Sequence, residues 1–213
     1  MSSWTALLDG LLLGISLAIL VGPIVITILQ TSLEQGFAAG IAVGSGIWIS
    51  DFLFVLSTYF GIKYVNAVIA WEGFEQVLGI AGGGVLAVIG LGFLFAKPPN
   101  LENWKAEAFR SSSYISLWTK GFLVNTVNPF TIVFWSTVAT TVAGDKASSG
   151  DYNVTVFYVG ILGVIILTDA LKVYLAKWIR TRLRRIHIIR LRQISGITLL
   201  IFGLIMVLRV YFF

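Results

Sequence analysis

The chain has 213 residues, of which 57% are hydrophobic and 12% are charged, and its mean hydropathy is +0.91. Because a soluble domain carries about 25% charged residues, this composition excludes water as the main solvent of the surface and indicates a polytopic membrane protein. The absence of cysteine excludes disulfides, thiolate metal sites and thiol catalysis, and the single histidine cannot build a histidine metal cluster.

Six apolar stretches are long enough to cross a bilayer as helices, which takes about 20 mostly apolar residues. In chain order they are 4–30, 36–62, 76–96, 117–142, 154–177 and 191–211. No basic segment precedes the first stretch and no small-residue cleavage site follows it, so we interpret it as a retained span and not as a signal peptide. The short apolar segment 64–70 is either an interfacial helix or an extension of a tilted span. The prediction is one all-α transmembrane domain over residues 1–213.

A proline break lies inside one apolar stretch of each half, and the next stretch carries a lone aspartate. Gly22-Pro23 interrupts the first stretch and is followed by Asp51, whereas Asn128-Pro129 interrupts the fourth and is followed by Asp169. A helix break at membrane depth frees backbone groups that hydrocarbon cannot satisfy, so it normally lines a polar cavity. The recurrence of the pattern predicts a duplicated transporter whose site lies between the halves.

The longest polar stretch, 97–116, divides the chain into repeat one at about 4–96 and repeat two at about 117–213. It begins with Lys97-Pro98-Pro99, and consecutive prolines stop a helix. Because each half has three spans, the halves enter the membrane in opposite senses, which predicts an inverted-topology repeat. In support, Ser50-Asp51 and Thr168-Asp169 are matching hydroxyl–acid pairs.

The cations sort between the two sides of the predicted bundle. If the N-terminus is outside, eleven cations lie on the face of the loops after spans 1, 3 and 5, and only three lie on the other face. Since positive loops stay in the cytoplasm, both termini are expected to be extracytoplasmic and the linker 97–116 cytoplasmic. The basic tract 177–193 could suggest nucleic acid. Its position between two spans favours a cytoplasmic loop that touches anionic lipid, with no nucleic-acid partner.

Three ionisable side chains at membrane depth are candidates for function, because such positions are costly to keep. Asp51 has no basic partner in its own span and could take up a proton or bind a cationic group; the alternative is an acid that only ties helices together. Asp169 and Lys172 lie three residues apart on one helix face. They could neutralise each other or bind the two charged groups of a zwitterion. Lys172 could also extend to the cytoplasmic interface.

The two prolines matter through the backbone groups that they uncover. Pro23 and Pro129 each expose a carbonyl one turn earlier, which suits an ammonium, and a half-helix N-terminus suits a carboxylate. Asn125 and Asn128 add amide groups beside the second break. Prolines also occur as simple kinks in membrane helices, but two at matching places favour a site for an amino acid.

These motifs resemble the LysE/RhtB family of amino-acid exporters. The similarity is carried by GISLAILVGPIVITILQTSLEQGFAAGIAVGSGIWISDF at 14–52 and WTKGFLVNTVNPFTIVFW at 118–135. The resemblance implies export of amino acids or related metabolites across a bacterial inner membrane, driven by the proton gradient. Carried over by position, it implies a site at Pro23, Asp51, Asn125, Asn128, Pro129 and Asp169.

The chain departs from the family pattern at both breaks. Val21 precedes Gly22-Pro23 where many members have Pro-Gly-Pro, and Phe130 follows Asn128-Pro129 where many have a lysine. The second departure concerns recognition of the substrate carboxylate and therefore the substrate subclass.

The prediction is a proton-coupled antiporter of small amino acids that works by alternating access, with protons and the lipid bilayer as its other partners and a homo-oligomer left open. The first alternative is a carrier or channel for another solute or a metal ion, although a hard cation wants several oxygen ligands. An intramembrane enzyme would need a catalytic pair, and none is visible. A membrane scaffold without transport has no need of buried acids. No cofactor or resident metal is expected.

Overall fold

The computed structural model describes residues 3–19, 22–69, 71–95, 113–141, 153–180, 182 and 185–212. Within these residues all regular secondary structure is α-helical, and the helices follow one another as α1 (Ser3–Ile19), α2 (Pro23–Gln35), α3 (Phe37–Ile69), α4 (Phe74–Phe95), α6 (Tyr114–Thr126), α7 (Pro129–Thr141), α8 (Val154–Arg180) and α9 (Arg185–Phe212). The predicted all-α class is confirmed.

Four of these helices are long and apolar enough to cross a membrane alone: α3 over Phe37–Thr58, α4, α8 over Val154–Ile179 and α9 over Ile186–Phe212. The α1–α2 pair is bent by 69° and the α6–α7 pair by 61°. If each bent pair is one broken span, the described residues hold up to six spans. The number six therefore depends on whether each pair crosses as a unit.

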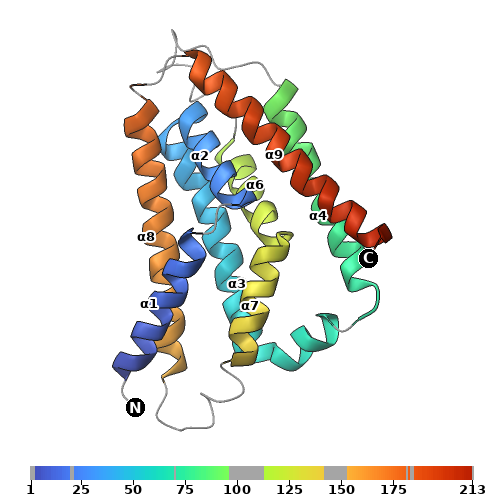
Figure 1. Cartoon of the computed structure of the whole chain (residues 1–213). Helices are drawn as coiled ribbons and strands as arrows, with labels where there is room; N and C mark the ends of the chain where they lie inside the picture. The colour runs from blue at the N-terminus through green and yellow to red at the C-terminus, as the bar shows by residue number, and fades with distance from the viewer. Residues whose placement is uncertain are drawn as a thin grey trace.

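Three helix pairs organise the bundle. α1 packs along α8, α3 along α6, and α4 along α9, and Figure 1 shows α4 and α9 side by side at one edge. Glycines permit each close approach, because a side chain would meet the partner helix. A Cβ on Gly14 of α1 would lie 3.0 Å from the Ile161 carbonyl oxygen of α8, and one on Gly83 of α4 would lie 2.6 Å from the Gly203 carbonyl oxygen of α9.

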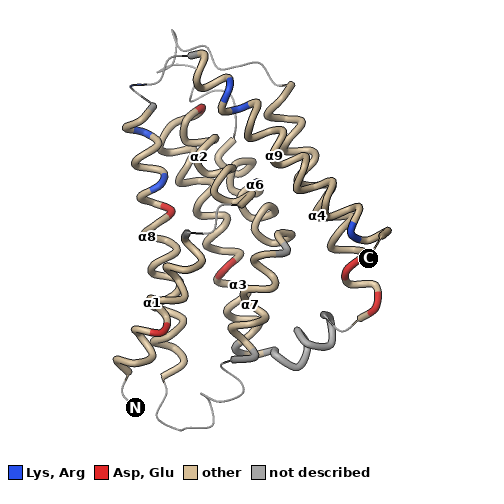
Figure 2. The backbone as a smooth tube through the Cα atoms, viewed as in Figure 1, with Lys and Arg blue, Asp and Glu red and all other residues tan. Residues whose placement is uncertain are grey.

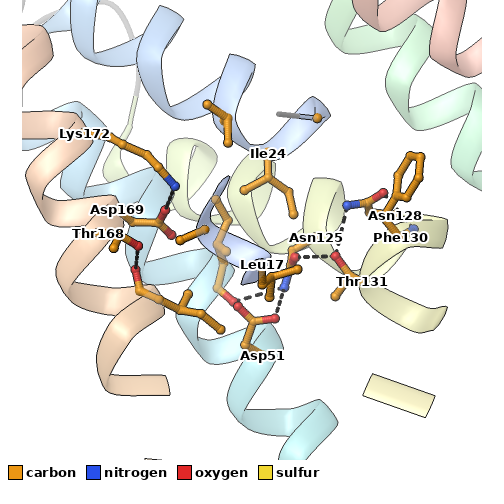
Figure 3. A pocket seen from close by; sticks show the side chains of 15 residues that line it. Leu17, Ile24, Asp51, Asn125, Asn128, Phe130, Thr131, Thr168, Asp169 and Lys172 are labelled. Atoms are coloured by element: carbon orange, nitrogen blue, oxygen red, sulfur yellow. Dashed lines mark hydrogen bonds and ion pairs between the residues drawn. The ribbon is translucent and has the colours of Figure 1, made fainter. Parts of the chain in front are cut away.

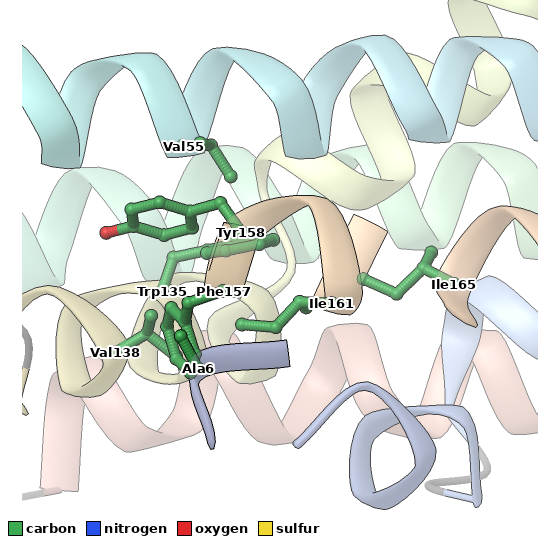
Figure 4. Close-up of a cluster of buried hydrophobic side chains, with 8 residues drawn as sticks. All are labelled: Ala6, Val55, Trp135, Val138, Phe157, Tyr158, Ile161 and Ile165. Atoms are coloured by element: carbon green, nitrogen blue, oxygen red, sulfur yellow. The ribbon is translucent and has the colours of Figure 1, made fainter. Parts of the chain in front are cut away.

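The apolar core is divided into three clusters around these contacts. One lies where α1, α3, α7 and α8 meet, and the fully buried Trp135 packs there between Tyr158 and Phe157 (Figure 4). A second joins α2, α3, α6 and α8 around Ile28, and a third joins α4, α6 and α9 around Leu199. Large apolar side chains also cover the outside of the bundle, as expected where lipid is the solvent.

Most of the basic residues seen in Figure 2 gather at one end of the bundle, where α8 ends and α9 begins, whereas acidic residues are spread over several helices. We call this the basic end. It carries Lys177 and Arg180 of α8 and Arg190 and Arg192 of α9. The basic tract 177–193 was predicted to be a loop, and this is wrong for most of it, because α8 continues to Arg180 and α9 starts at Arg185. Arginine, leucine and lysine are good helix formers, so both apolar spans extend into the tract.

Other predicted boundaries differ by smaller amounts. α2 continues to Gln35. α3 continues through the segment 64–69, which is therefore an extension of the second predicted span. α6 begins at Tyr114, where the Ser113 hydroxyl accepts a hydrogen bond from the Ile115 amide at 3.3 Å. Ser113 therefore caps the helix, and the last residues of the predicted linker, 114–116, belong to α6. Residues 97–112 of that linker lie outside the described part of the chain.

Candidate functional site

The first proline break separates α1 from α2. Gly22 is extended, with φ of −144°, and Pro23 is the first residue of α2, a position at which the missing proline N–H leaves no helical bond unmade. The Thr27 hydroxyl donates to the Pro23 carbonyl at 2.7 Å. The break therefore leaves Gly22 and Ile24 beside a cavity, whereas Pro23 is buried next to them and is absent from the cavity wall.

The second break separates α6 from α7 and is closed by side chains. The side-chain oxygen of Asn128 (Oδ1) accepts a hydrogen bond from the Phe130 backbone amide at 3.2 Å and so caps α7. The Asn128 amide donates to the Thr131 hydroxyl at 3.0 Å, and that hydroxyl donates to the Asn125 amide oxygen at 2.9 Å. Pro129 is the first residue of α7, the same position that Pro23 has in α2.

The hydrogen-bond chain from the second break ends at Asp51 of α3. The Asn125 amide donates to the Asp51 carboxylate at 2.9 Å, and the Trp135 indole donates to the same oxygen at 2.9 Å. Asp51 is 3% exposed, and within the described residues no cation forms an ion pair with it. Two neutral donors thus hold this carboxylate without cancelling a negative charge on it.

Asp169 of α8 has a different environment. The Lys172 ammonium lies 2.9 Å from its carboxylate, and the Trp48 indole of α3 donates to the other carboxylate oxygen at 3.3 Å. The lysine side chain keeps 21% of its exposure and the aspartate side chain 5%. The predicted pair on one helix face is therefore made, and Lys172 is directed to Asp169.

The Asp51–Asn125 pair and the Asp169–Lys172 pair line one cavity of about 100 Å³. Figure 3 shows Asp169 and Lys172 on one side and the Asp51–Asn125 pair across from them, with Leu17 and Ile24 between. The cavity brings together the five polar residues of the predicted site: Asp51, Asn125, Asn128, Asp169 and Lys172. The rest of the wall is mainly apolar and comes from the following residues: Leu17, Ala18, Gly22, Ile24, Val25, Ile47, Phe130 and Ile165, with Thr131 and Thr168 as hydroxyls.

Among the described residues, the charged groups that line the cavity are two carboxyls and one ammonium. With Lys172 paired to Asp169, Asp51 is the acid left without a cationic partner, so the ionised site has a net charge of −1. Such a site suits one proton or one ammonium group. Within the described residues, no group of three or more His, Cys, Asp or Glu side chains could hold a metal ion.

Three contributors were missed by reasoning from the sequence: Trp48, Trp135 and Thr131. A buried indole N–H normally finds an acceptor, and the two acids at membrane depth are strong ones. Two tryptophans within predicted spans were therefore a usable signal. It could not indicate which indole reaches which acid, because Trp48 lies three residues before Asp51 and yet donates to Asp169.

Apolar helices packed around a buried polar cavity at two helix breaks define a multi-pass membrane protein of the translocator class. Residues 15–209 match the family described as LysE type translocator, and the chain belongs to this family, whose members are transporters and not enzymes. The resemblance predicted from the two proline motifs is thereby confirmed. The chain is also similar to the "Putative amino acid efflux protein YcgF" of Bacillus subtilis (strain 168), with 26% identity over 164 residues, or 75% of each chain. No solved structure matches the chain.

Proposed function

We propose that the protein exports small neutral amino acids from the bacterial cytoplasm across the inner membrane in exchange for protons. One observation carries the proposal: the cavity at the two helix breaks joins an unpaired acid to an acid–lysine pair. The family and the name of the Bacillus relative support this cargo.

The cavity offers complementary partners for both ends of an amino acid. The substrate ammonium would replace a proton at Asp51, which Asn125 and Trp135 hold in place. The carboxylate would lie near Lys172, assisted by the N-terminal ends of α2 and α7, whose dipoles favour negative charge. Asn128 would orient the second of these ends through its cap on Phe130.

The apolar wall and the volume limit the substrate side chain. A cavity of about 100 Å³ lined by Leu17, Ile24, Val25 and Ile47 suits a short aliphatic or hydroxyl side chain. An acidic substrate would bring a second carboxylate to a wall with only one ammonium. That excess charge would be buried without a partner, which is costly.

Proton coupling follows from competition for one carboxylate. Asp51 would bind the substrate ammonium when the cavity faces the cytoplasm and would accept a proton when the ammonium leaves on the other side. The protonated acid would return and release its proton to the cytoplasm. Because the two ligands exclude each other, each outward movement of substrate is tied to one inward proton.

Alternating access would use the two halves as inverted repeats. Two sets of glycine contacts support this symmetry. Gly14 of α1 abuts the Ile161 carbonyl, eight residues before Asp169, while Gly121 of α6 abuts the Val43 carbonyl, eight residues before Asp51. On α4 and α9, the Gly83–Gly203 contact is matched by a Gly90–Gly196 contact, and a twofold axis between these helices would exchange the two. The basic end would be cytoplasmic, so both termini would lie outside.

The test is efflux from bacterial cells that overexpress the protein and are loaded with dipeptides of alanine, valine, threonine, lysine or glutamate. We expect faster release of alanine, valine or threonine than from cells without the protein, and no gain for glutamate.

Asp51→Asn keeps the side-chain shape and should return amino-acid release to the rate of cells without the protein, at equal membrane abundance. Normal export by this variant would exclude the proposed role of Asp51. Resistance to cobalt or manganese without amino-acid release would show a metal cargo instead.

A further inference from the structure

A second buried polar cluster lies outside the cavity, between α2 and α9. The Gln30 amide donates to the Glu34 carboxylate at 2.6 Å, and the Arg192 guanidinium lies 3.2 Å from the same carboxylate oxygen. The Ser195 hydroxyl donates to the Gln30 amide oxygen at 3.3 Å. We call these four residues the ion cluster. Gln30, Glu34 and Arg192 are each at most 8% exposed.

The ion cluster also holds the end of α4. Arg192 donates to the Phe93 carbonyl at 2.6 Å and to the Gly92 carbonyl at 3.3 Å, close to Phe95, the last residue of α4 that the structure describes. Lys120 of α6 lies over the Phe93 ring at 4.0 Å and 3.5 Å from the Thr31 hydroxyl. Arg192 thus links the start of α9 to the backbone of α4 as well as to Glu34.

These contacts connect the two halves of the chain. Arg192, Ser195 and Lys120 belong to the second half, and their partners on α2 and α4 belong to the first. A buried ion pair adds little net stability, because both charges lose their hydration. Separation of the halves would return that hydration, so the closed and open arrangements can be close in free energy.

The ion cluster lies on the side of the cavity that faces the basic end, and Arg192 belongs to both. Glu34 is eleven residues after Pro23, which is about 16 Å along α2 from the first break. Arg192 is near the start of α9 and Phe93 near the end of α4. The contacts therefore close the bundle on the side through which a cytoplasmic substrate would have to pass.

We propose that the ion cluster is the cytoplasmic gate of the transporter, and that the Glu34–Arg192 pair separates when the cavity opens to the cytoplasm. This inference rests on the proposed function for its direction. Loss of either charge should favour the inward-open state, because the closed state alone contains the pair.

The gate can be tested by cysteine labelling, since the chain has no native cysteine. Ala18 of α1 lines the cavity, and Ala18→Cys serves as the reporter. Fluorescein-5-maleimide, which does not cross membranes, is added to inside-out vesicles so that it reaches the cytoplasmic side. We expect Glu34→Gln and Arg192→Gln each to raise the labelling rate at position 18 by about fivefold. Arg192→Lys should raise it less, because it retains a positive charge beside Glu34.

The matched control is Ala6→Cys on the same helix, where Ala6 is 0% exposed in the Trp135 cluster. Gate opening should leave position 6 unlabelled, whereas unfolding would expose both positions. If one variant unfolds, the other two still test the gate. Unchanged labelling at position 18 in folded variants, or labelling that rises only together with position 6 in all three, would overturn the proposal. Because no cargo is needed, labelling that responds without amino-acid export would reject the proposed cargo and leave the gate standing.

Discussion

At the scale of single residues, the two aspartates of the cavity differ in what surrounds them. Asp169 has Lys172 at 2.9 Å, so its charge is balanced within one helix. Asp51 has only neutral donors, from Asn125 and Trp135. A carboxylate held by neutral donors can still bind a proton or an ammonium group, whereas one beside a fixed cation already has a partner for its charge. This difference is why we propose the exchange at Asp51 and place the carboxylate end of the substrate near Lys172.

Trp135 positions Asp51, and Trp135→Phe tests that role. Phenylalanine retains a ring against Tyr158 and Phe157 but removes the indole donor. A hydrogen bond to a charged group is worth about 1.5–3 kcal/mol, so we expect amino-acid efflux to fall by roughly tenfold or more while the protein remains folded. The measurement is the efflux assay at equal membrane abundance. Trp4→Phe is the control, because Trp4 is 65% exposed. Equal activity of the two variants would contradict the positioning role.

The sequence indicated which charged residues are energetically costly at membrane depth, and these were the candidates for function. It did not indicate which contacts they make. Asp51, Asp169 and Lys172 were predicted because charge is rare at membrane depth. Trp48, Trp135 and Thr131 were missed because tryptophan and threonine are ordinary in membrane helices. Their donors acquire a role only when α7 is placed against α3 and α3 against α8, and this depends on tertiary packing.

At the scale of helices, proline marked both breaks correctly, and its effect is indirect. Pro23 and Pro129 each start a new helix, and the two helix pairs are bent by 69° and 61°. Their neighbours Gly22 and Asn128 line the cavity, whereas Pro23 is buried beside it. A proline break is therefore better understood as a device that turns adjacent residues toward a site than as part of the site.

The α4–α9 pair provides a direct test of glycine packing. A Cβ on Gly83 would lie 2.6 Å from the Gly203 carbonyl oxygen, whereas one on the neighbouring Gly84 would meet nothing within 4 Å. Gly83→Ala should therefore force the helices apart and destabilise the protein by roughly 1–3 kcal/mol. We expect a lower melting temperature in detergent for Gly83→Ala and none of that loss for Gly84→Ala. Similar melting temperatures for the two variants would show that the helix contact can relax without cost.

At the scale of the whole molecule, composition and periodic apolar stretches were sufficient for the fold class and for the position of most helices. They were insufficient for helix ends, because the basic tract 177–193 continues both α8 and α9 as helix. The ion cluster could not be predicted from the sequence either. Glu34 and Arg192 are 158 residues apart in the chain and meet only when the two halves pack.

Exchange of one proton for one zwitterion moves a net positive charge into the cell with each cycle, so transport should respond to membrane voltage. A potential of 100 mV is worth about 2.3 kcal/mol per charge, which corresponds to roughly a 50-fold concentration ratio at equilibrium. Proteoliposomes loaded with radiolabelled L-valine and given a valinomycin–potassium potential, negative inside, should release valine faster than at zero potential. External acid should act in the same direction, because it supplies the inward proton.

The same experiment separates the possible charges of the cargo. Export of a cationic amino acid against one proton moves no net charge, so its rate would be insensitive to the potential. Asp51→Asn provides the matched control, because it removes the carboxyl at which proton and ammonium compete while retaining the acceptor oxygen for Asn125 and Trp135. We expect this variant to lose its response to both voltage and pH. If voltage-driven valine release persists in Asp51→Asn, the proton must bind to another group. Asp169 would be the candidate, because it is the other acid among the described residues that line the cavity.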